Sequence, residues 1–163
     1  MRQLWAPWRL EFIKGDKPSG CFLCEAADAD GSRDAELLVL ARTDLALAIL
    51  NRYPYNNGHL MVAPRAHVAT LDELPSETAN AVTALSQRAL RVLRAALQPD
   101  GFNLGINAGK VAGAGVADHM HQHIVPRWDG DTNFMPVLAE TKVLNEHLAA
   151  SYQELRKSFD RQP

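Results

Sequence analysis

One long amphipathic segment constrains the fold of this chain more than any other feature. Up to a Pro99-Asp100-Gly101 stop, apolar residues repeat at helical spacing and form a single stripe, made of Val82, Leu85, Leu90, Leu93 and Leu97. The spacing predicts a helix that opens at Pro75-Ser76, with Ser76 as its N-cap, and runs up to this stop. This helix interrupts a series of shorter apolar segments, and that order decides the fold class.

The shorter segments have the composition and length of strands. Four of them are expected at residues 37–42, 45–51, 59–64 and 101–107, and a fifth begins in the histidine-rich stretch near residue 119. A last helix over about 141–159 closes the chain. Runs of strands with one long helix inserted predict an α+β fold with an antiparallel sheet of about five strands.

Length and charge narrow the classes of function. At 163 residues the chain is long enough for one domain with a sizeable core. Its net charge of −2 argues against sequence-independent binding of nucleic acid, but not against a small anionic ligand at a local site. No apolar run approaches the roughly 20 residues that span a bilayer, and the N-terminus lacks the apolar core of a secretion signal. We therefore expect a cytoplasmic protein that binds neither nucleic acid nor membrane.

Residues 118–128, DHMHQHIVPRW, place His119, His121 and His123 at every second position. On a strand, such side chains emerge on one face. Structural histidines are one interpretation, but crowded imidazoles then each need a hydrogen-bond partner. A single three-histidine zinc site is disfavoured, because the outer two residues of the strand lie about 13 Å apart. The third interpretation divides the tasks: one imidazole attacks phosphorus, the next donates to a phosphate oxygen, and the first orients or binds metal.

The two cysteines of the chain, Cys21 and Cys24, form a Cys-x-x-Cys pair, which is a common half-site for tetrahedral zinc. A redox pair is the first alternative, but no clear strand precedes Cys21; a pair of buried thiols without function is the second. Zinc needs two further ligands, and the candidates are His59, His67 and His119. We choose His67 and His119, because a His59 that faces the core suits packing or support of the other histidines.

Residues 107–118, NAGKVAGAGVAD, form a glycine-rich loop directly before the histidines. Glycines at 109, 113 and 115 let backbone N–H groups approach an anion closely. The P-loop order G-x-x-x-x-G-K-S/T is absent, so an ordinary turn is the alternative. The position before three aligned histidines favours phosphate binding.

Together these motifs resemble the signature of the histidine triad family of nucleotide hydrolases and transferases. HMHQHIV matches its His-φ-His-φ-His-φ-φ motif, NRYPYNNGHLMVAP resembles its upstream Asn…Gly-His…Val-x-Pro segment, and CFLC with PRAH resembles its zinc-binding members. The WAPWR start and the PRWDGDTNFMPV tail look like the bacterial branch that acts on diadenosine polyphosphates as hydrolase or phosphorylase. Two positions depart from the pattern: Gln122 stands where the motif prefers an apolar residue, and Gly115-Val116 where some members place Gln or Ser.

The resemblance implies a histidine triad fold over residues 21–140, with an N-terminal extension packed on it at 1–20 and a C-terminal helix of the same domain at 141–163. It implies a homodimer whose two sheets become continuous. It also implies a cleavage of diadenosine tetraphosphate or a close relative at the α-phosphorus. The alternatives are a hydrolase of nucleoside phosphoramidates or adenylyl amines, and a nucleotide-binding regulatory protein with incidental activity.

The same resemblance assigns roles to residues. His121 is implied as the nucleophile that forms a nucleotidyl-histidine, and His123 as the residue that contacts the α-phosphate and helps the leaving group. Asn51 is implied to bind the ribose, and the phosphates are implied to meet Asn107, Gly113 and Gly115. A closed, structural Zn²⁺ site is implied at Cys21, Cys24, His67 and His119.

Overall fold

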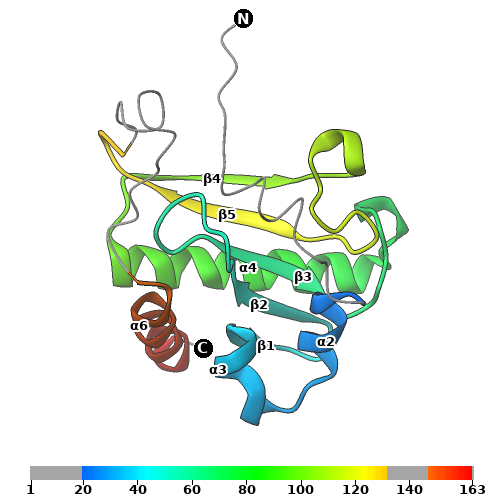
Figure 1. Ribbon diagram of the computed structural model, residues 1–163, viewed down its shortest axis with the longest axis horizontal. Helices are drawn as coiled ribbons and strands as arrows, with labels where there is room; N and C mark the ends of the chain where they lie inside the picture. The colour runs from blue at the N-terminus through cyan, green and yellow to red at the C-terminus, as the bar shows by residue number, and fades with distance from the viewer. Residues whose placement is uncertain (1–19, 132–146, 163) are drawn as a thin grey trace, which may run out of the picture.

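The structure, a computed structural model, describes residues 20–131 and 147–162 (Figure 1). Its centre is an antiparallel five-stranded sheet in the order β1-β2-β3-β5-β4. The strands are β1 Val39–Arg42, β2 Ala46–Leu50, β3 Leu60–Pro64, β4 Gly101–Ile106 and β5 Gln122–Arg127. The predicted α+β fold with an antiparallel sheet of about five strands is confirmed. The predicted extension at 1–20 lies, apart from Gly20, outside the described residues.

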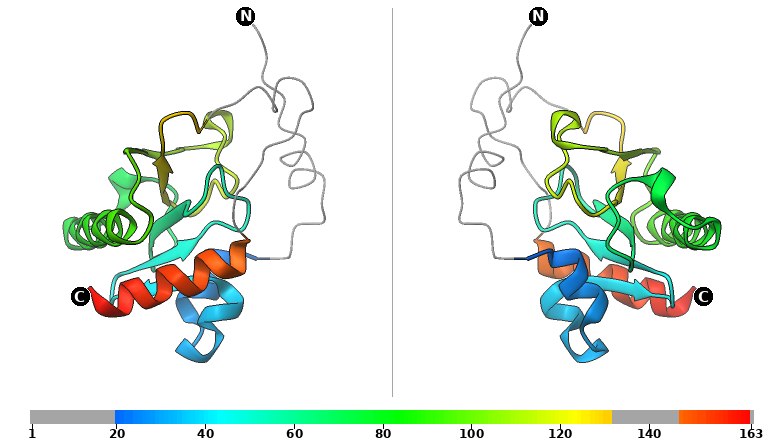
Figure 2. Two further views of the ribbon diagram at one scale, coloured as in Figure 1. Left: turned by 90° about the vertical axis from the view of Figure 1, so that its left-hand side faces the viewer. Right: turned by 90° about the vertical axis from the view of Figure 1, so that its right-hand side faces the viewer.

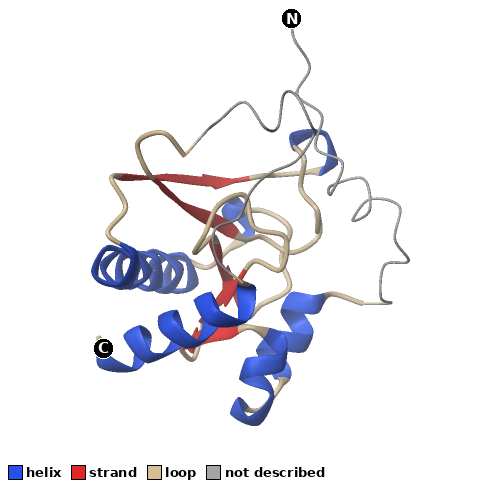
Figure 3. Cartoon of the chain, turned by 60° about the vertical axis from the view of Figure 1, so that its left-hand side comes forward, coloured by secondary structure: helices blue, strands red, loops and turns tan. Residues whose placement is uncertain are grey.

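Helices pack on both faces of this sheet. They are α2 Phe22–Asp28, α3 Asp34–Leu37, α4 Ser76–Leu97 and α6 Leu148–Arg161, with short 3-10 turns η1 Gly31–Arg33, η2 Leu71–Glu73 and η3 Lys110–Ala112. α4 and α6 lie side by side on one face, and α2 packs on the other (Figures 2 and 3). Among the described residues, no helix is both long and apolar enough to cross a membrane.

Burial from two sides explains why β2 and β3 read as unbroken apolar runs. All five residues of each strand are buried, because alternate side chains meet different helices. Toward α4 and α6 the sheet packs Ala48, Leu50, Leu60, Val62 and Ile124. Toward α2 it packs Val39, Leu47, Ile49, Met61 and Ala63.

The long helix predicted between Pro75-Ser76 and the Pro99-Asp100-Gly101 stop is confirmed as Ser76–Leu97, but its N-cap is Pro75 and not Ser76. The last helix begins at Leu148 and ends at Arg161, so it extends past the predicted end at 159; residues 141–146 of that prediction lie outside the described part of the chain. The first strand was expected from residue 37, and this is wrong. Leu37 ends α3, and Leu38 takes a left-handed conformation with φ of 62° before β1 begins.

The histidine stretch also differs from the prediction of one strand. β5 begins only at Gln122, so His119 and His121 precede it. The reason is a different hydrogen bond: the Met120 N–H donates to the carbonyl of Val68 at 2.7 Å. The approach to β5 is therefore tied to the segment after β3.

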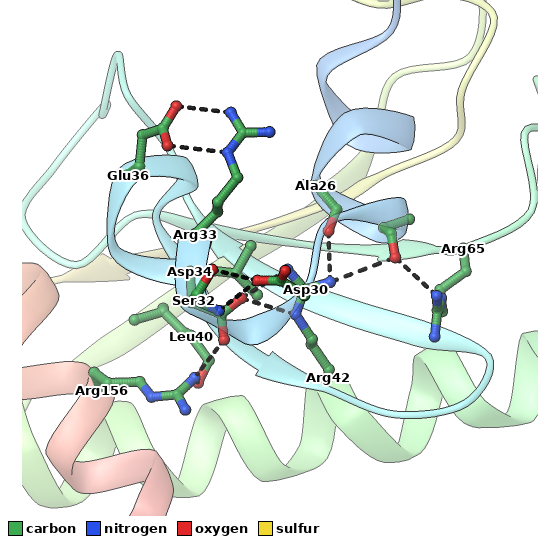
Figure 4. A network of polar contacts seen from close by, with 12 residues as sticks. Ala26, Asp30, Ser32, Arg33, Asp34, Glu36, Leu40, Arg42, Arg65 and Arg156 are labelled. Atoms are coloured by element: carbon green, nitrogen blue, oxygen red, sulfur yellow. Dashed lines mark hydrogen bonds and ion pairs between the residues drawn. The ribbon is translucent and has the colours of Figure 1, made fainter.

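A partly buried polar network holds α2 against the sheet (Figure 4). Asp34 accepts from Arg42 Nε at 2.8 Å and from Arg156 Nη1 at 3.3 Å. Arg42 also donates to the carbonyl of Ala26, and Arg65 donates to the carbonyl of Ala27 at 2.8 Å. The last carbonyls of a helix lack partners within it, so the two arginines fix the C-terminal end of α2. The opposite end of α2 carries the two cysteines.

Candidate metal centre and histidine site

Side chains from separate parts of the chain converge at the start of α2. One donor atom each from Cys21, Cys24, His67 and His119 lie within 4.8 Å of one another. The Nδ1 of His67 lies 3.1 Å from the Cys24 sulfur, and the Nδ1 of His119 lies 3.3 Å from the sulfur of Cys21 and 3.5 Å from that of Cys24. A tetrahedral ion about 2.3 Å from sulfur and about 2.0 Å from nitrogen holds such ligands roughly 3.5 Å apart. The donor set therefore fits a four-coordinate metal ion.

The protonation chemistry of this cluster favours a cation. Burial raises the pKa of Cys24 to about 11 because it removes water from the thiolate, and the hydrogen bond and the charge of the adjacent Cys21 add to this effect. A metal cation removes this penalty, since it binds thiolates. Burial lowers the pKa of His119 and so keeps its imidazole neutral. Its Nε2–H donates to the carbonyl of Pro64 at 2.9 Å, which leaves Nδ1 as the ligand atom toward the sulfurs.

His121 is held by its neighbour through the backbone. Its Nδ1 lies 2.8 Å from the carbonyl oxygen of His119. Because a carbonyl only accepts, Nδ1 carries the proton, and the lone pair of the neutral ring is on Nε2. Burial lowers the pKa of His121, which favours this neutral form. A neutral imidazole with its lone pair on Nε2 is a competent nucleophile.

His123 takes the opposite tautomer through a chain of two hydrogen bonds. The backbone N–H of Tyr55 donates to Nδ1 of the fully buried His59 at 3.0 Å. His59 therefore carries its proton on Nε2, and this nitrogen lies 3.0 Å from Nδ1 of His123. His123 then accepts at Nδ1 and, when neutral, holds its own proton on Nε2. The rings of His121 and His123 are 5.0 Å apart and nearly perpendicular, so a nucleophilic nitrogen stands beside a hydrogen-bond donor.

The predicted nucleotide contacts lie in two loops. Asn51 follows β2, and its side-chain oxygen accepts the Tyr53 N–H at 2.9 Å. In the glycine-rich loop, Gly113 has φ of 86°, a conformation that favours glycine. Its N–H closes the η3 turn by donating to Lys110 at 3.0 Å. Asn107 is half-buried and Gly115 is exposed, and the phosphate contacts of this loop stay predictions.

Gln122, the departure from the motif, lies beside α4 and contacts Ser86. The Ser86 hydroxyl lies 2.8 Å from the Val82 carbonyl and 2.7 Å from the side-chain oxygen of Gln122. One hydroxyl proton serves only one acceptor, and the carbonyl cannot donate. The consistent arrangement turns the amide, so that the Gln122 NH₂ donates to Ser86. The polar residue is satisfied on the α4 side of β5.

Sequence reasoning considered His59 as a zinc ligand, as a packing residue or as a support of the other histidines, and it missed Tyr55 and Asn56. Tyr55 donates through its backbone N–H, and its ring centroid also lies 4.6 Å from that of His59; no motif in the sequence pointed to either contact. Asn56 donates to Asp131 at 2.9 Å across 75 positions of the chain. The Gly-His pair before an apolar run was the one available signal for His59.

Comparison with known proteins places these features in a family. The family model described as "HIT domain" matches residues 32–130. The chain is 37% identical over its full length to an AP-4-A phosphorylase of Mycobacterium tuberculosis, of which it covers 87%. It is 34% identical over 98 residues to an adenylylsulfatase of Arabidopsis thaliana, and the match covers 60% of this chain and 49% of that protein.

A solved structure shares the fold. A zinc-bound histidine triad family protein from Mycobacterium smegmatis superposes with a TM-score of 0.67 at 29% identity, over 87% of this chain and 94% of that one. The histidine motif, the family model and the full-length relative lead to one conclusion: the chain belongs to the histidine triad (HIT) family.

Proposed function

We propose that this protein cleaves diadenosine polyphosphates, with diadenosine tetraphosphate or a close relative as substrate, at the α-phosphorus. One observation carries the proposal: backbone contacts give His121 a lone pair on Nε2 and give His123 a proton on Nε2, side by side. The resemblance to a protein named AP-4-A phosphorylase supports the choice of substrate.

In the proposed reaction, Nε2 of His121 attacks the α-phosphorus and forms a P–N bond. The bond from that phosphorus to the bridging oxygen breaks, and its electron pair leaves with ATP when the substrate is the tetraphosphate. His123 donates from Nε2 to a phosphate oxygen and stabilises the developing charge. The carbonyl of His119 stabilises the positive ring of His121 through Nδ1–H. Water then displaces the ring to give AMP, or inorganic phosphate displaces it to give ADP.

Asn51 in this proposal binds the ribose. Asn107, Gly113 and Gly115 line the phosphate site, which is supported by the position of their loop between β4 and the histidines. The side-chain oxygen of Asn51 accepts from the Tyr53 N–H and has a second lone pair for a ribose hydroxyl, whereas its Nδ2 lies 3.4 and 3.5 Å from the two ring nitrogens of His59.

We propose Zn²⁺ as the ion of the metal centre. Two thiolates and two imidazoles form a donor set typical of structural zinc. Four protein ligands leave no open position for water, so the ion supplies a crosslink and no reaction step. The crosslink joins α2, the segment after β3 and the approach to β5, and it fixes His119, whose carbonyl orients His121.

The proposed protein is a cytoplasmic homodimer. Reduced thiols at Cys21 and Cys24 suit that compartment. β4 is an edge strand of the sheet, and Leu104 on it is 45% exposed, which supports pairing with a second copy through this edge.

Incubation with diadenosine tetraphosphate, with and without inorganic phosphate, tests the function. Turnover to ADP and ATP that requires phosphate identifies a phosphorylase, and AMP with ATP in its absence identifies a hydrolase. Two molecules of ADP contradict attack at the α-phosphorus. His121→Ala is expected to lose turnover by about 10⁴-fold or more while it keeps most nucleotide binding. Turnover that survives in His121→Ala rules out the covalent step.

A further inference from the structure

Asp131 accepts hydrogen bonds from the end of β5 and from the turn between β2 and β3. Its carboxylate, on a side chain 8% exposed, accepts from Nε and Nη2 of Arg127 at 2.6 and 2.7 Å. It also accepts from the Trp128 N–H at 3.1 Å and from Nδ2 of Asn56 at 2.9 Å. Arg127 reaches onward to the side-chain oxygen of Asn103 on β4 at 2.7 Å. A bidentate charged pair of this kind is strong and geometrically specific, so the carboxylate has a fixed place.

Asn56 links this carboxylate to the turn between β2 and β3. Its Nδ2 donates one proton to Asp131 and lies 3.1 Å from the carbonyl of Pro126, which takes the other. The backbone oxygen of Asn56 accepts the His59 N–H at 3.1 Å. The turn is thereby pinned to the end of β5 at the residue that follows Tyr55.

The N–H of Tyr55 in turn fixes the proton of His59. The two tautomers of a neutral imidazole are close in energy, so a neighbouring hydrogen bond selects between them. With Tyr55 N–H on Nδ1, His59 presents Nε2–H to His123. If that donor moves away, His59 is able to hold its proton on Nδ1 and to present a lone pair to His123. His123 then carries its proton on Nδ1 and turns a lone pair, instead of a donor, toward a phosphate oxygen.

We infer that Asn56 and Asp131 are positioning residues for the histidine pair: they hold the Tyr55 N–H on His59 and thereby keep the proton of His123 on Nε2. Neither residue touches the reacting atoms. The effect of these two residues on catalysis rests on the proposed function, whereas the tautomers of His59 and His123 do not depend on it.

The test compares Asn56→Ala and Asp131→Asn with Asp129→Asn. Asp129 is an exposed acid of the same turn, so its substitution matches the chemical change without touching the link. Long-range ¹H–¹⁵N NMR of the labelled protein distinguishes Nδ1–H from Nε2–H in His59 and His123. We expect Nε2–H for both residues in the parent and in Asp129→Asn, and mixed tautomers in the other two variants. The kcat on diadenosine tetraphosphate should fall by about ten- to a hundredfold in those two, with a smaller change in KM.

Several results overturn the inference. The inference is wrong if His59 of the parent protein carries its proton on Nδ1. It is also wrong if Asn56→Ala folds and His59 and His123 keep the tautomers of the parent. Asn56→Ala leaves the pair of Arg127 and Asp131 intact and carries the test if Asp131→Asn does not fold. Mixed tautomers with unchanged kcat overturn the catalytic part. If the parent shows the expected tautomers but does not cleave the dinucleotide, the proposed function fails and the tautomer assignment stands.

Discussion

Replacing Gly58 by alanine tests how tightly the backbone beside the histidines is packed. Gly58 has φ of 72°, and a Cβ there would lie 2.4 Å from a methyl carbon of Leu97, 3.3 Å from one of Leu93 and 3.4 Å from Cγ of Pro126. The left-handed conformation costs a residue with a side chain about 1–2 kcal/mol. Overpacking costs about 1–3 kcal/mol, and the low end applies because the clashing atom is the tip of the half-buried Leu97. The free energy of unfolding should therefore fall by roughly 2–3 kcal/mol.

Urea titration and calorimetry measure this loss, which corresponds to a fall in Tm of roughly 4–12 °C for a domain of this size. Gly101→Ala is the matched control, because Gly101 lies in β4 without a positive φ and a Cβ added there would meet nothing within 4 Å. Its stability should stay within about 0.5 kcal/mol of the parent. A loss below about 1 kcal/mol in Gly58→Ala, or an equal loss in both variants, refutes the reasoning.

Two further predictions concern the surroundings of α2. Asp34→Asn should lower the free energy of unfolding, measured by urea titration, by about 3–5 kcal/mol, because Arg42 and Arg156 then face a neutral amide at a site where the Asp34 side chain is 10% exposed. The control is Glu36→Gln at an exposed position, which should cost less than about 1 kcal/mol. Similar losses in the two variants contradict the role of burial. Cys24→Ser should reduce bound zinc, measured by elemental analysis of the purified protein, from one per chain to well below one, and a parent without metal rules out the proposed centre.

Local patterns were sufficient to predict the sheet, the long helix and the cluster of two cysteines and two histidines. The apolar stripe of α4 repeats at helical spacing from Val82 to Leu97, and few other structures accommodate such a run. The cluster of Cys21, Cys24, His67 and His119 follows from two short motifs and the chemistry of thiols and imidazoles. Both predictions depend on residue types, which the sequence states directly.

The details that failed depend on backbone geometry and long-range contacts. Leu38 takes a left-handed conformation that its residue type disfavours. The local sequence therefore gives no indication that β1 begins at Val39 and not at residue 37. The position of Tyr55 depends on Asn56 and Asp131, which are 75 residues apart. A residue that acts through its backbone N–H has no signature in a pattern of side chains.

The three histidines of the motif have chemically identical side chains. The structure distinguishes them by the backbone group to which hydrogen bonds connect each ring. His119 donates from Nε2 to Pro64, so Nδ1 faces the cysteines. His121 donates from Nδ1 to His119, so Nε2 keeps its lone pair. His123 is assigned by Tyr55 through His59 and holds its proton on Nε2. Carbonyls and N–H groups do not titrate in the range of imidazole, so the backbone group at the end of each chain keeps its role as donor or acceptor, although the chain to His123 passes through the ionisable ring of His59. A division of labour among identical residues therefore needs a rigid backbone around them. The cluster of Cys21, Cys24, His67 and His119 holds the segment that carries His119 and His121. The Asp131 contacts and the Gly58 turn hold the loop that carries Tyr55 and His59.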